Sequence, residues 1–231
     1  KISKINFLKG YRMKFIGIIL LLLTSIFLIA CSANQASNKI SNSELESLAS
    51  KYGGVYVFNQ KFVEEIEKRE AERKELRKTL GDKIRSNPRK IKQGDKFITI
   101  YDVDTTLIDK NLPKILSNGK RYYLDSINYE NQTGKRVKIP KEFADKIINF
   151  IGLENYNKFK PSMGLGYFYI DNNGVVIPID ISATYSYQSK KYGLFGDEGA
   201  GIKFSKSETN YVLGGNKFYF DSSKNTFVKE K

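Results

Sequence analysis

A dense cluster of basic residues lies between residues 83 and 96, where the sequence reads KIRSNPRKIKQGDK. This stretch holds six basic side chains and one acidic side chain, and a proline interrupts it. Clustered cations attract sulfated glycans and acidic protein surfaces through short-range forces that salt weakens. The stretch lacks the interleaved aromatic residues of a nucleic-acid platform, so no nucleic-acid partner is expected. We predict a solvated connecting loop, with an anionic-ligand site on this basic loop as the alternative. Its residues would be Lys83, Arg85, Arg89, Lys90, Lys92 and Lys96.

A pair of aspartates follows an apolar run in the sequence FITIYDVDTTLID, which spans residues 97–109. This Asp-x-Asp-x-Thr-Leu pattern resembles the first motif of haloacid-dehalogenase-type phosphatases. The resemblance implies that Asp102 is the nucleophile toward phosphate and that Asp104 handles the leaving-group proton. It also implies a magnesium ion, which would neutralise the charge that keeps a carboxylate from a phosphate dianion.

The remainder of that phosphatase pattern is absent from the sequence. The family requires a Ser or Thr, a Lys and acidic metal ligands, each after a further parallel strand. The candidates here are about six to eight residues apart, too few for the crossover helices of a parallel sheet. They are Ser182 or Thr184, Lys190 or Lys191, and Asp197 with Glu198. A calcium loop fails as well, because position 12 counted from Asp102 is Pro113. We therefore predict no enzyme, no catalytic residue, no metal and no cofactor, with a metal-dependent phosphatase centred on Asp102 and Asp104 as an alternative.

The chain contains no His and one Cys, Cys31. Without His there is no Ser-His triad and no imidazole general base. A solitary Cys excludes a disulfide framework and a Cys-based structural zinc site. The chemistry left to Cys31 depends on its position in the chain.

Cys31 follows an uncharged apolar run, residues 15–30, that Arg12 and Lys14 flank on its N-terminal side. The run is shorter than the roughly 20 residues of a membrane-spanning helix, and its flanks are typical of a secretory signal. Its end, Leu-Ile-Ala-Cys, resembles the bacterial lipobox, which implies cleavage before Cys31 and a durable lipid anchor on it. An uncleaved signal anchor is the alternative. Because Met13 opens a well-proportioned signal, residues 1–12 are interpreted as upstream of the true start, or else as a long n-region.

Length and charge restrict the remaining classes. The chain has 231 residues, 39 of them Lys or Arg and 25 Asp or Glu, for a net charge of +14. Removal of residues 1–30 would take away five basic and no acidic residues, which leaves a net charge of +9. A hydrophobic content of 40% with 30 Phe and Tyr excludes a wholly disordered chain. Anionic glycans, acidic host proteins and lipid headgroups are the partners that such a charge favours outside the cell.

The elements that must position these groups follow from periodicity and turn residues. Ser41 and Glu44 have capping-box spacing and predict a short helix to about residue 51, before a strand at residues 53–59. Residues 60–80 lack Gly and Pro and predict an exposed helix with a solvated middle, ended by Gly81.

Aromatic and β-branched runs from residue 97 onward predict strands, and residues 140–151 predict one packing helix. Hairpin turns are expected at residues 171–174 and 214–216. The fold class is therefore α+β: an N-terminal helical segment followed by a mainly antiparallel β-sheet domain with one packing helix. The predicted segments are a signal peptide (1–30), a lipidated Cys and flexible tether (31–43), a helical, charged segment with the basic loop (44–96) and the β-rich domain (97–231).

The leader and lipobox, MKFIGIILLLLTSIFLIACSAN, and the Lys-, Asn- and Ile-rich body are similar to Borrelia plasmid-encoded outer-surface lipoproteins, within them to the S2-antigen-like group. The resemblance implies a palmitate-bearing lipoprotein in the outer membrane, displayed at the cell surface, that contacts host or tick molecules. We accordingly predict a non-enzymatic surface antigen or host-binding protein, with a host protein or a glycosaminoglycan as partner. A periplasmic lipoprotein of envelope maintenance is the other alternative.

Overall fold

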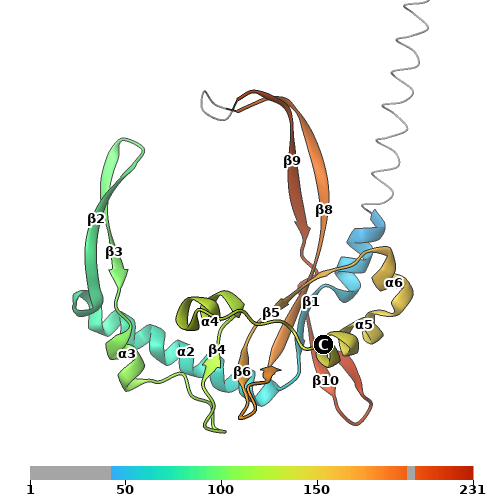
Figure 1. Ribbon diagram of the computed structural model, residues 1–231, viewed down its shortest axis with the longest axis horizontal. Coiled ribbons are helices and arrows are strands. Elements are labelled where there is room, and N and C mark those ends of the chain that lie inside the picture. Colours follow the sequence, from blue (N-terminus) through green and yellow to red (C-terminus); the bar gives the residue numbers. More distant parts are fainter. Residues whose placement is uncertain (1–42, 197–200, 231) are drawn as a thin grey trace, which may run out of the picture. The chain divides into compact units, whose positions relative to one another are not determined.

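The computed structural model describes residues 43–196 and 201–230 (Figure 1). Residues Leu48–Lys231 form one compact unit of the chain. Residues 43–52 are helical, which agrees with the helix expected there.

The main sheet has the strand order β11-β10-β1-β8-β5, and β9 pairs with the distal part of β8. Its strands are β1 (Gly54–Val57), β5 (Ser162–Leu165), β8 (Asp180–Phe195), β9 (Lys203–Val212), β10 (Asn216–Asp221) and β11 (Thr226–Lys229). Every pairing in it is antiparallel except that of β1 with β10. Together with the helices, this confirms the predicted α+β class.

One face of this sheet carries an aromatic core. Tyr56 stacks on Phe218 with ring centroids 4.7 Å apart, and Phe150 from α5 (Lys141–Ile151) lies 5.2 Å from the Phe218 ring. Ile147 and Ile151 are buried on the same helix, which Gly152 ends as predicted. Pro140 precedes the first helical residue instead of occupying it. Helix α6 (Leu153–Lys158) follows directly.

A second core lies where α2 (Gln60–Leu80) meets a three-stranded sheet. Asn59 caps α2 by accepting the backbone N–H of Phe62 at 3.0 Å, and the helix ends before Gly81, as predicted. Buried side chains of α2 and of strand β4 contribute to this core, which contains Val57, Val63, Ile66, Leu116, Tyr122 and Ile179. The small sheet consists of β4 (Tyr122–Tyr123), β6 (Phe168–Ile170) and β7 (Val176–Pro178). The hairpin turn expected at residues 171–174 joins β6 to β7.

The predicted basic loop is wrong in its local structure. After η1 (Gly81–Ile84), residues from this stretch form β2 (Arg85–Gln93), which pairs antiparallel with β3 (Lys96–Val103). Pro88 is tolerated because it lies where the register shifts between Ser86 and Arg89, and a residue without an N–H fits such an irregularity.

The predicted domain boundary at residues 96 and 97 falls inside this hairpin. Strand β1, which was assigned to the helical segment, lies between β10 and β8 in the main sheet. A division there would therefore cut both a hairpin and a sheet. Residues 48–231 form one compact unit instead.

Two further local expectations differ from the structure. Residues 214–216 do not turn a hairpin, because β9 pairs with β8 while β10 pairs with β1 and β11. The strand expected after residue 120 is short, because Asp125 caps α4 (Ser126–Thr133) by accepting the backbone N–H of Asn128. Another short helix, α3 (Thr106–Asn111), follows β3.

Candidate functional site

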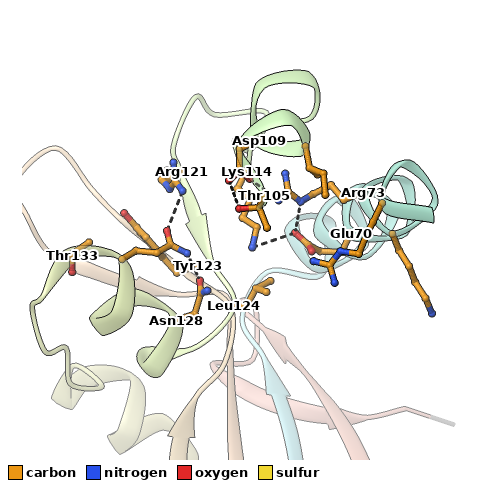
Figure 2. Close-up of a pocket in the computed structure, with 14 residues that line it drawn as sticks. Glu70, Arg73, Thr105, Asp109, Lys114, Arg121, Tyr123, Leu124, Asn128 and Thr133 are labelled. Carbon is orange, nitrogen blue, oxygen red and sulfur yellow. Dashed lines mark hydrogen bonds and ion pairs between the residues drawn. The ribbon is translucent and has the colours of Figure 1, made fainter. Parts of the chain in front are cut away.

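A cleft of about 960 Å³ opens among the C-terminal half of α2, helix α3, strand β4 and helix α4 (Figure 2). Its wall is polar, with few apolar side chains. We call it the basic cleft, because the charged side chains that line it are Glu70, Arg73, Lys74, Arg77, Asp109, Lys114 and Arg121. Five cations against two carboxylates give this concave surface a net charge of +3. A concave surface of one charge concentrates its field and attracts ligands of the opposite charge.

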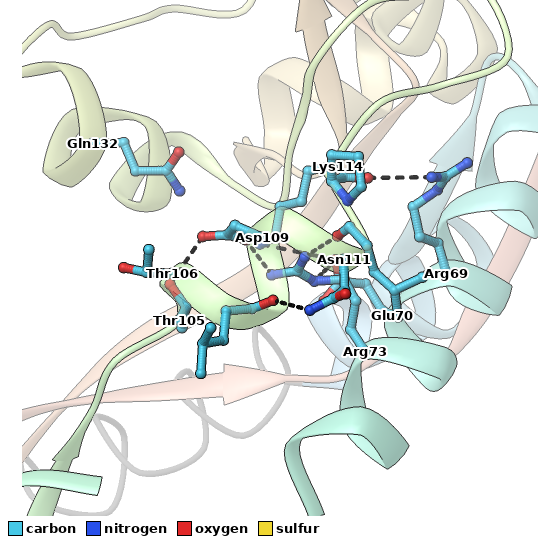
Figure 3. Close-up of polar contacts among 12 residues, drawn as sticks. Arg69, Glu70, Arg73, Thr105, Thr106, Asp109, Asn111, Lys114 and Gln132 are labelled. Carbon is cyan, nitrogen blue, oxygen red and sulfur yellow. Dashed lines mark hydrogen bonds and ion pairs between the residues drawn. The ribbon is translucent and has the colours of Figure 1, made fainter. Parts of the chain in front are cut away.

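The floor of the cleft is held by Arg73, a buried arginine in the middle of α2. Its Nη2 lies 2.6 Å from Oδ1 of Asp109 on α3, and its Nε lies 3.5 Å from Oε1 of Glu70 (Figure 3). It also donates to the backbone carbonyl of Leu112. The planar guanidinium thus ties α2 to α3, and the predicted solvated middle of α2 is wrong at this residue.

Glu70 is the second residue that holds the floor of the basic cleft in place. Its Oε1 accepts the hydroxyl of the buried Tyr122 at 2.7 Å and lies 3.8 Å from Nζ of Lys114. Burial and this hydrogen bond to a carboxylate raise the pKa of Tyr122, so the phenol stays protonated as a donor. Burial also lowers the pKa of Lys114, against the attraction of Glu70, because its side chain is only 10% exposed.

Asp109 stays ionised beside these cations. Burial alone would raise its pKa, but hydrogen bonds from Arg73 and Thr105 and the charges of Arg73 and Lys114 lower it. The Thr105 hydroxyl lies 3.0 Å from Oδ2 of Asp109. Both carboxylates of the cleft are thus occupied by groups of the protein itself, and neither acts as a free acid or base.

The opposite wall offers groups that suit a hydroxylated ligand. Arg121 donates to Oε1 of Gln132 at 3.0 Å, and the Gln132 amide donates to Asn128 at 3.0 Å. The Arg121 guanidinium also lies over the Tyr123 ring, 5.9 Å from its centroid. The wall therefore combines a cation, an aromatic face and side-chain amides.

On the α2 rim, Lys74 and Arg77 are exposed and line the cleft. Neither has a carboxylate within 4.0 Å among residues 43–196 and 201–230. Like Arg121, which donates only to the neutral Gln132 amide, they are cations of this cleft whose charge no carboxylate of the described residues compensates.

The residues predicted to bind an anion lie together, but on the β2–β3 hairpin and outside the lining of the basic cleft. Arg85 pairs with Asp82 at 2.8 Å, and Arg89 pairs with Asp102 on β3. Lys90 and Lys92 project on one face of the hairpin, because alternate residues of a strand share a face. The remaining two predicted residues are Lys83 in η1 and Lys96 at the start of β3. Phe97 lies opposite Lys92, so the aromatic missing from the basic stretch comes from its partner strand.

The arrangement around Asp102 and Asp104 does not supply the phosphatase constellation. Asp102 lies on a strand of a two-stranded antiparallel hairpin and pairs there with Arg89. Asp104 accepts the backbone N–H of Thr106 at 2.9 Å, and hydrogen bonds from Thr106 lower its pKa. No group of three or more acidic, Cys or His side chains that could hold a metal occurs in the part of the chain that the structure describes. The candidate partners Ser182, Thr184, Lys190 and Lys191 all lie on β8, while Asp197 and Glu198 lie outside the described residues.

The predicted leader, Cys31 and tether all lie outside the described residues. Within residues 43–196 and 201–230, no helix combines the length and the apolar character that crossing a bilayer requires.

Sequence reasoning missed the basic cleft, whose charged residues are spread over α2, α3, β4 and their connections. One signal was present. Val63, Ile66, Glu70, Arg73 and Arg77 follow one another at alternating spacings of three and four, so they share one face of α2. Comparison of the chain with protein-family models, with curated proteins and with solved structures found no match.

Proposed function

We propose that this protein is a non-enzymatic, lipid-anchored surface lipoprotein that binds a sulfated glycan of the host in the basic cleft. The observation that carries the proposal is the excess of five cations over two carboxylates on one concave surface. Arg73 and Lys114 are engaged with Asp109 and Glu70, so a ligand would meet chiefly Lys74, Arg77 and Arg121.

The size and lining of the basic cleft favour a glycan over a small phosphate. A cleft of about 960 Å³ with cations on two walls suits an elongated polyanion, whereas a phosphate needs a compact nest of donors. The amides of Asn128 and Gln132 suit sugar hydroxyls, and the Tyr123 ring, which stacks on Phe168, holds the Arg121 guanidinium beside them.

The test is titration of the full chain, purified in detergent, with a heparin-derived oligosaccharide at an ionic strength of about 0.15 M. The triple variant Lys74→Gln, Arg77→Gln and Arg121→Gln removes the three accessible charges and keeps good helix formers on α2. We expect the triple variant to bind the oligosaccharide about tenfold more weakly or worse. The matched control is Lys61→Gln, an exposed change on the first turn of α2 that lies outside the cleft lining. Equal losses in both proteins, or none in the triple variant, would remove the cleft from consideration.

The β2–β3 hairpin is a second cationic surface that the same titration can separate from the cleft. The variant Arg89→Glu, Lys90→Glu and Lys92→Glu reverses three charges on β2. If the hairpin carries the binding, heparin affinity falls in this variant and is retained in the cleft variant. If the cleft carries it, the order is reversed.

The lipid anchor and surface display are part of the proposal and rest on the leader and lipobox, which are similar to those of the Borrelia S2-antigen-like lipoproteins. Radiolabelled palmitate should be incorporated by the full chain and not by Cys31→Ala. Protease added to intact cells should remove the mature protein while a periplasmic control is protected. Protection that ends only when the outer membrane is opened would favour the periplasmic alternative.

A further inference from the structure

A second cleft, of about 720 Å³, lies on the face of the main sheet opposite the aromatic core. Successive strand residues point to opposite faces, so Tyr56 belongs to the core while Val55 and Val57 line the cleft. The N-terminal half of α2 contributes Val63 and Glu67 to it. Helix α2 thus borders two clefts: its C-terminal half lines the basic cleft and its N-terminal half lines this second cleft.

The charge of this second cleft is opposite to that of the basic cleft. Its charged lining consists of Glu67, Asp180, Glu230 and Lys217. Three carboxyl groups against one ammonium make it acidic in a chain whose net charge is +14. We call it the acidic cleft.

Asp180 is the feature of the acidic cleft that the fold does not account for. The residue is only 8% exposed, although it lies at the start of β8 and lines the cleft. Its Oδ1 accepts the backbone N–H of Tyr167 at 3.2 Å, and its Oδ2 has no hydrogen-bond partner among the described residues. Burial raises the pKa of this carboxyl to about 6. No cation lies within ion-pair distance of this buried carboxyl among the described residues, which costs stability that a bound cation would restore.

The one cation of the acidic cleft is directed elsewhere. Lys217 has no carboxylate within 4.0 Å among the described residues, and its Nζ lies over the Tyr219 ring, 5.6 Å from the centroid. Tyr219 in turn donates to Glu230 at 2.9 Å. Lys217 therefore acts on Asp180 through its charge at a distance and makes no ion pair with it.

We infer that the acidic cleft binds a primary ammonium group on an apolar stem, as in a lysine side chain, with the ammonium at Asp180. An ammonium supplies the positive charge and the donor that Oδ2 lacks. The methylene stem would lie against apolar side chains that line the same cleft, among them Val55, Val57 and Leu213. Gly166 leaves room for this carboxylate, because a Cβ there would lie 1.8 Å from Oδ1 of Asp180.

The test compares two probes that differ in one charged group. N-acetyl-lysine methylamide carries the ammonium, and N-acetyl-norleucine methylamide has the same apolar stem without it. Saturation-transfer NMR on the full chain in detergent should show binding of the lysine probe and at least about tenfold weaker binding of the norleucine probe. Equal binding of the two probes, or no binding of either, would overturn the inference.

Two variants locate the binding. Asp180→Asn keeps an oxygen acceptor for the Tyr167 N–H and removes the charge, so it should weaken the lysine probe about tenfold or more. Asp145→Asn removes an exposed carboxylate of α5 that lies outside this cleft and should leave the affinity within about twofold. Unchanged affinity in Asp180→Asn would place the ammonium elsewhere and overturn the inference.

A pH titration separates direct binding from a structural effect. Affinity for the lysine probe should rise from about pH 5 to about pH 7 as Asp180 ionises, and this rise should be absent in Asp180→Asn. The other titratable groups that face Asp180 are Glu67 from α2, Tyr167 before β6, Lys217 from β10 and Glu230 after β11. A rise that persists in Asp180→Asn would assign the effect to one of these groups and overturn the role of Asp180.

Discussion

Arg73 of α2 and Asp109 of α3, which are 36 residues apart in the sequence, meet at 2.6 Å through Nη2 and Oδ1. The guanidinium is buried while the carboxylate is partly exposed, so the pair forms the floor of the basic cleft and not a surface contact. Because Arg73 also binds Glu70 and the Leu112 carbonyl, one side chain fixes α3 and its following connection onto α2.

Replacement of Arg73 should be the most destabilising change in the basic cleft. Arg73→Met keeps the aliphatic stem but takes the buried guanidinium away from Asp109, Glu70 and the Leu112 carbonyl, which should cost about 3 kcal/mol of unfolding free energy. Urea unfolding of the parent and the variant measures this loss of unfolding free energy. Lys78→Met is the control, because its pair with Glu75 is exposed and should contribute less than about 0.5 kcal/mol. Equal losses would show that the pairing of Arg73 adds nothing to stability.

Gly214 is predicted to be irreplaceable where β9 passes to β10. A Cβ at this position would lie 2.1 Å from the Gly53 carbonyl oxygen and 2.2 Å from that of Ala49, both backbone atoms that cannot turn away. Gly214→Ala should therefore cost about 2 kcal/mol or more in chemical unfolding. Gly193→Ala, whose Cβ would meet only the Phe195 ring at 3.4 Å, should stay within about 0.5 kcal/mol of the parent.

The connection from β9 to β10 shows why part of the topology could not be predicted from the sequence. Residues 214–216 carry a strong hairpin signal, but the two strands beside them pair with β8 and β1 and not with each other. Local signals gave the C-terminal ends of α2 and α5, because Gly81 and Gly152 act on their own helix termini. They did not predict β2, because Pro88 and the many charges of that segment disfavour a strand. The pairing with β3 overrides these local preferences.

The candidate sites were beyond local reasoning for a related reason. A charged residue in a helix is exposed unless a distant segment covers it, and the cover of Arg73 comes from α3 and the residues after it. The sequence around Asp180 shows only the alternating pattern of a strand, which does not reveal that the residue is buried or that it accepts the Tyr167 N–H. The basic stretch from Lys83 to Lys96 was visible because it is contiguous, although its position on a hairpin was not.

Asp102 is predicted to support no phosphatase chemistry. Its carboxylate pairs with Arg89 on an exposed hairpin, so no parallel sheet presents it to a metal or to phosphate. Magnesium should leave Tm unchanged, and the full chain should not hydrolyse a chromogenic phosphate monoester. Asp102→Asn should cost no more than about 0.5 kcal/mol, as expected for an exposed ion pair. Magnesium-dependent hydrolysis that Asp102→Asn abolishes would contradict this.

Ionisation of Asp180 should weaken the fold as the pH rises. Its pKa is about 6 in the folded protein against 3.8 for an unperturbed Asp, so the folded state binds more protons between these values. The unfolding free energy should therefore fall from about pH 4 to about pH 6 and be insensitive to this group above that range. The difference corresponds to about 3 kcal/mol.

Asp180→Asn removes this dependence while it keeps the acceptor for Tyr167. Relative to the parent, the variant should gain about 3 kcal/mol in unfolding free energy between pH of about 4 and about 7, measured by urea unfolding at each pH. Asp145→Asn, an exposed carboxylate paired with Lys141, should show no such gain. Because the lysine probe requires the ionised carboxylate, its saturation should restore near neutral pH part of the stability that ionisation removes from the parent. If the probe stabilises Asp180→Asn as much as the parent, the cost of ionising Asp180 is unrelated to ligand binding.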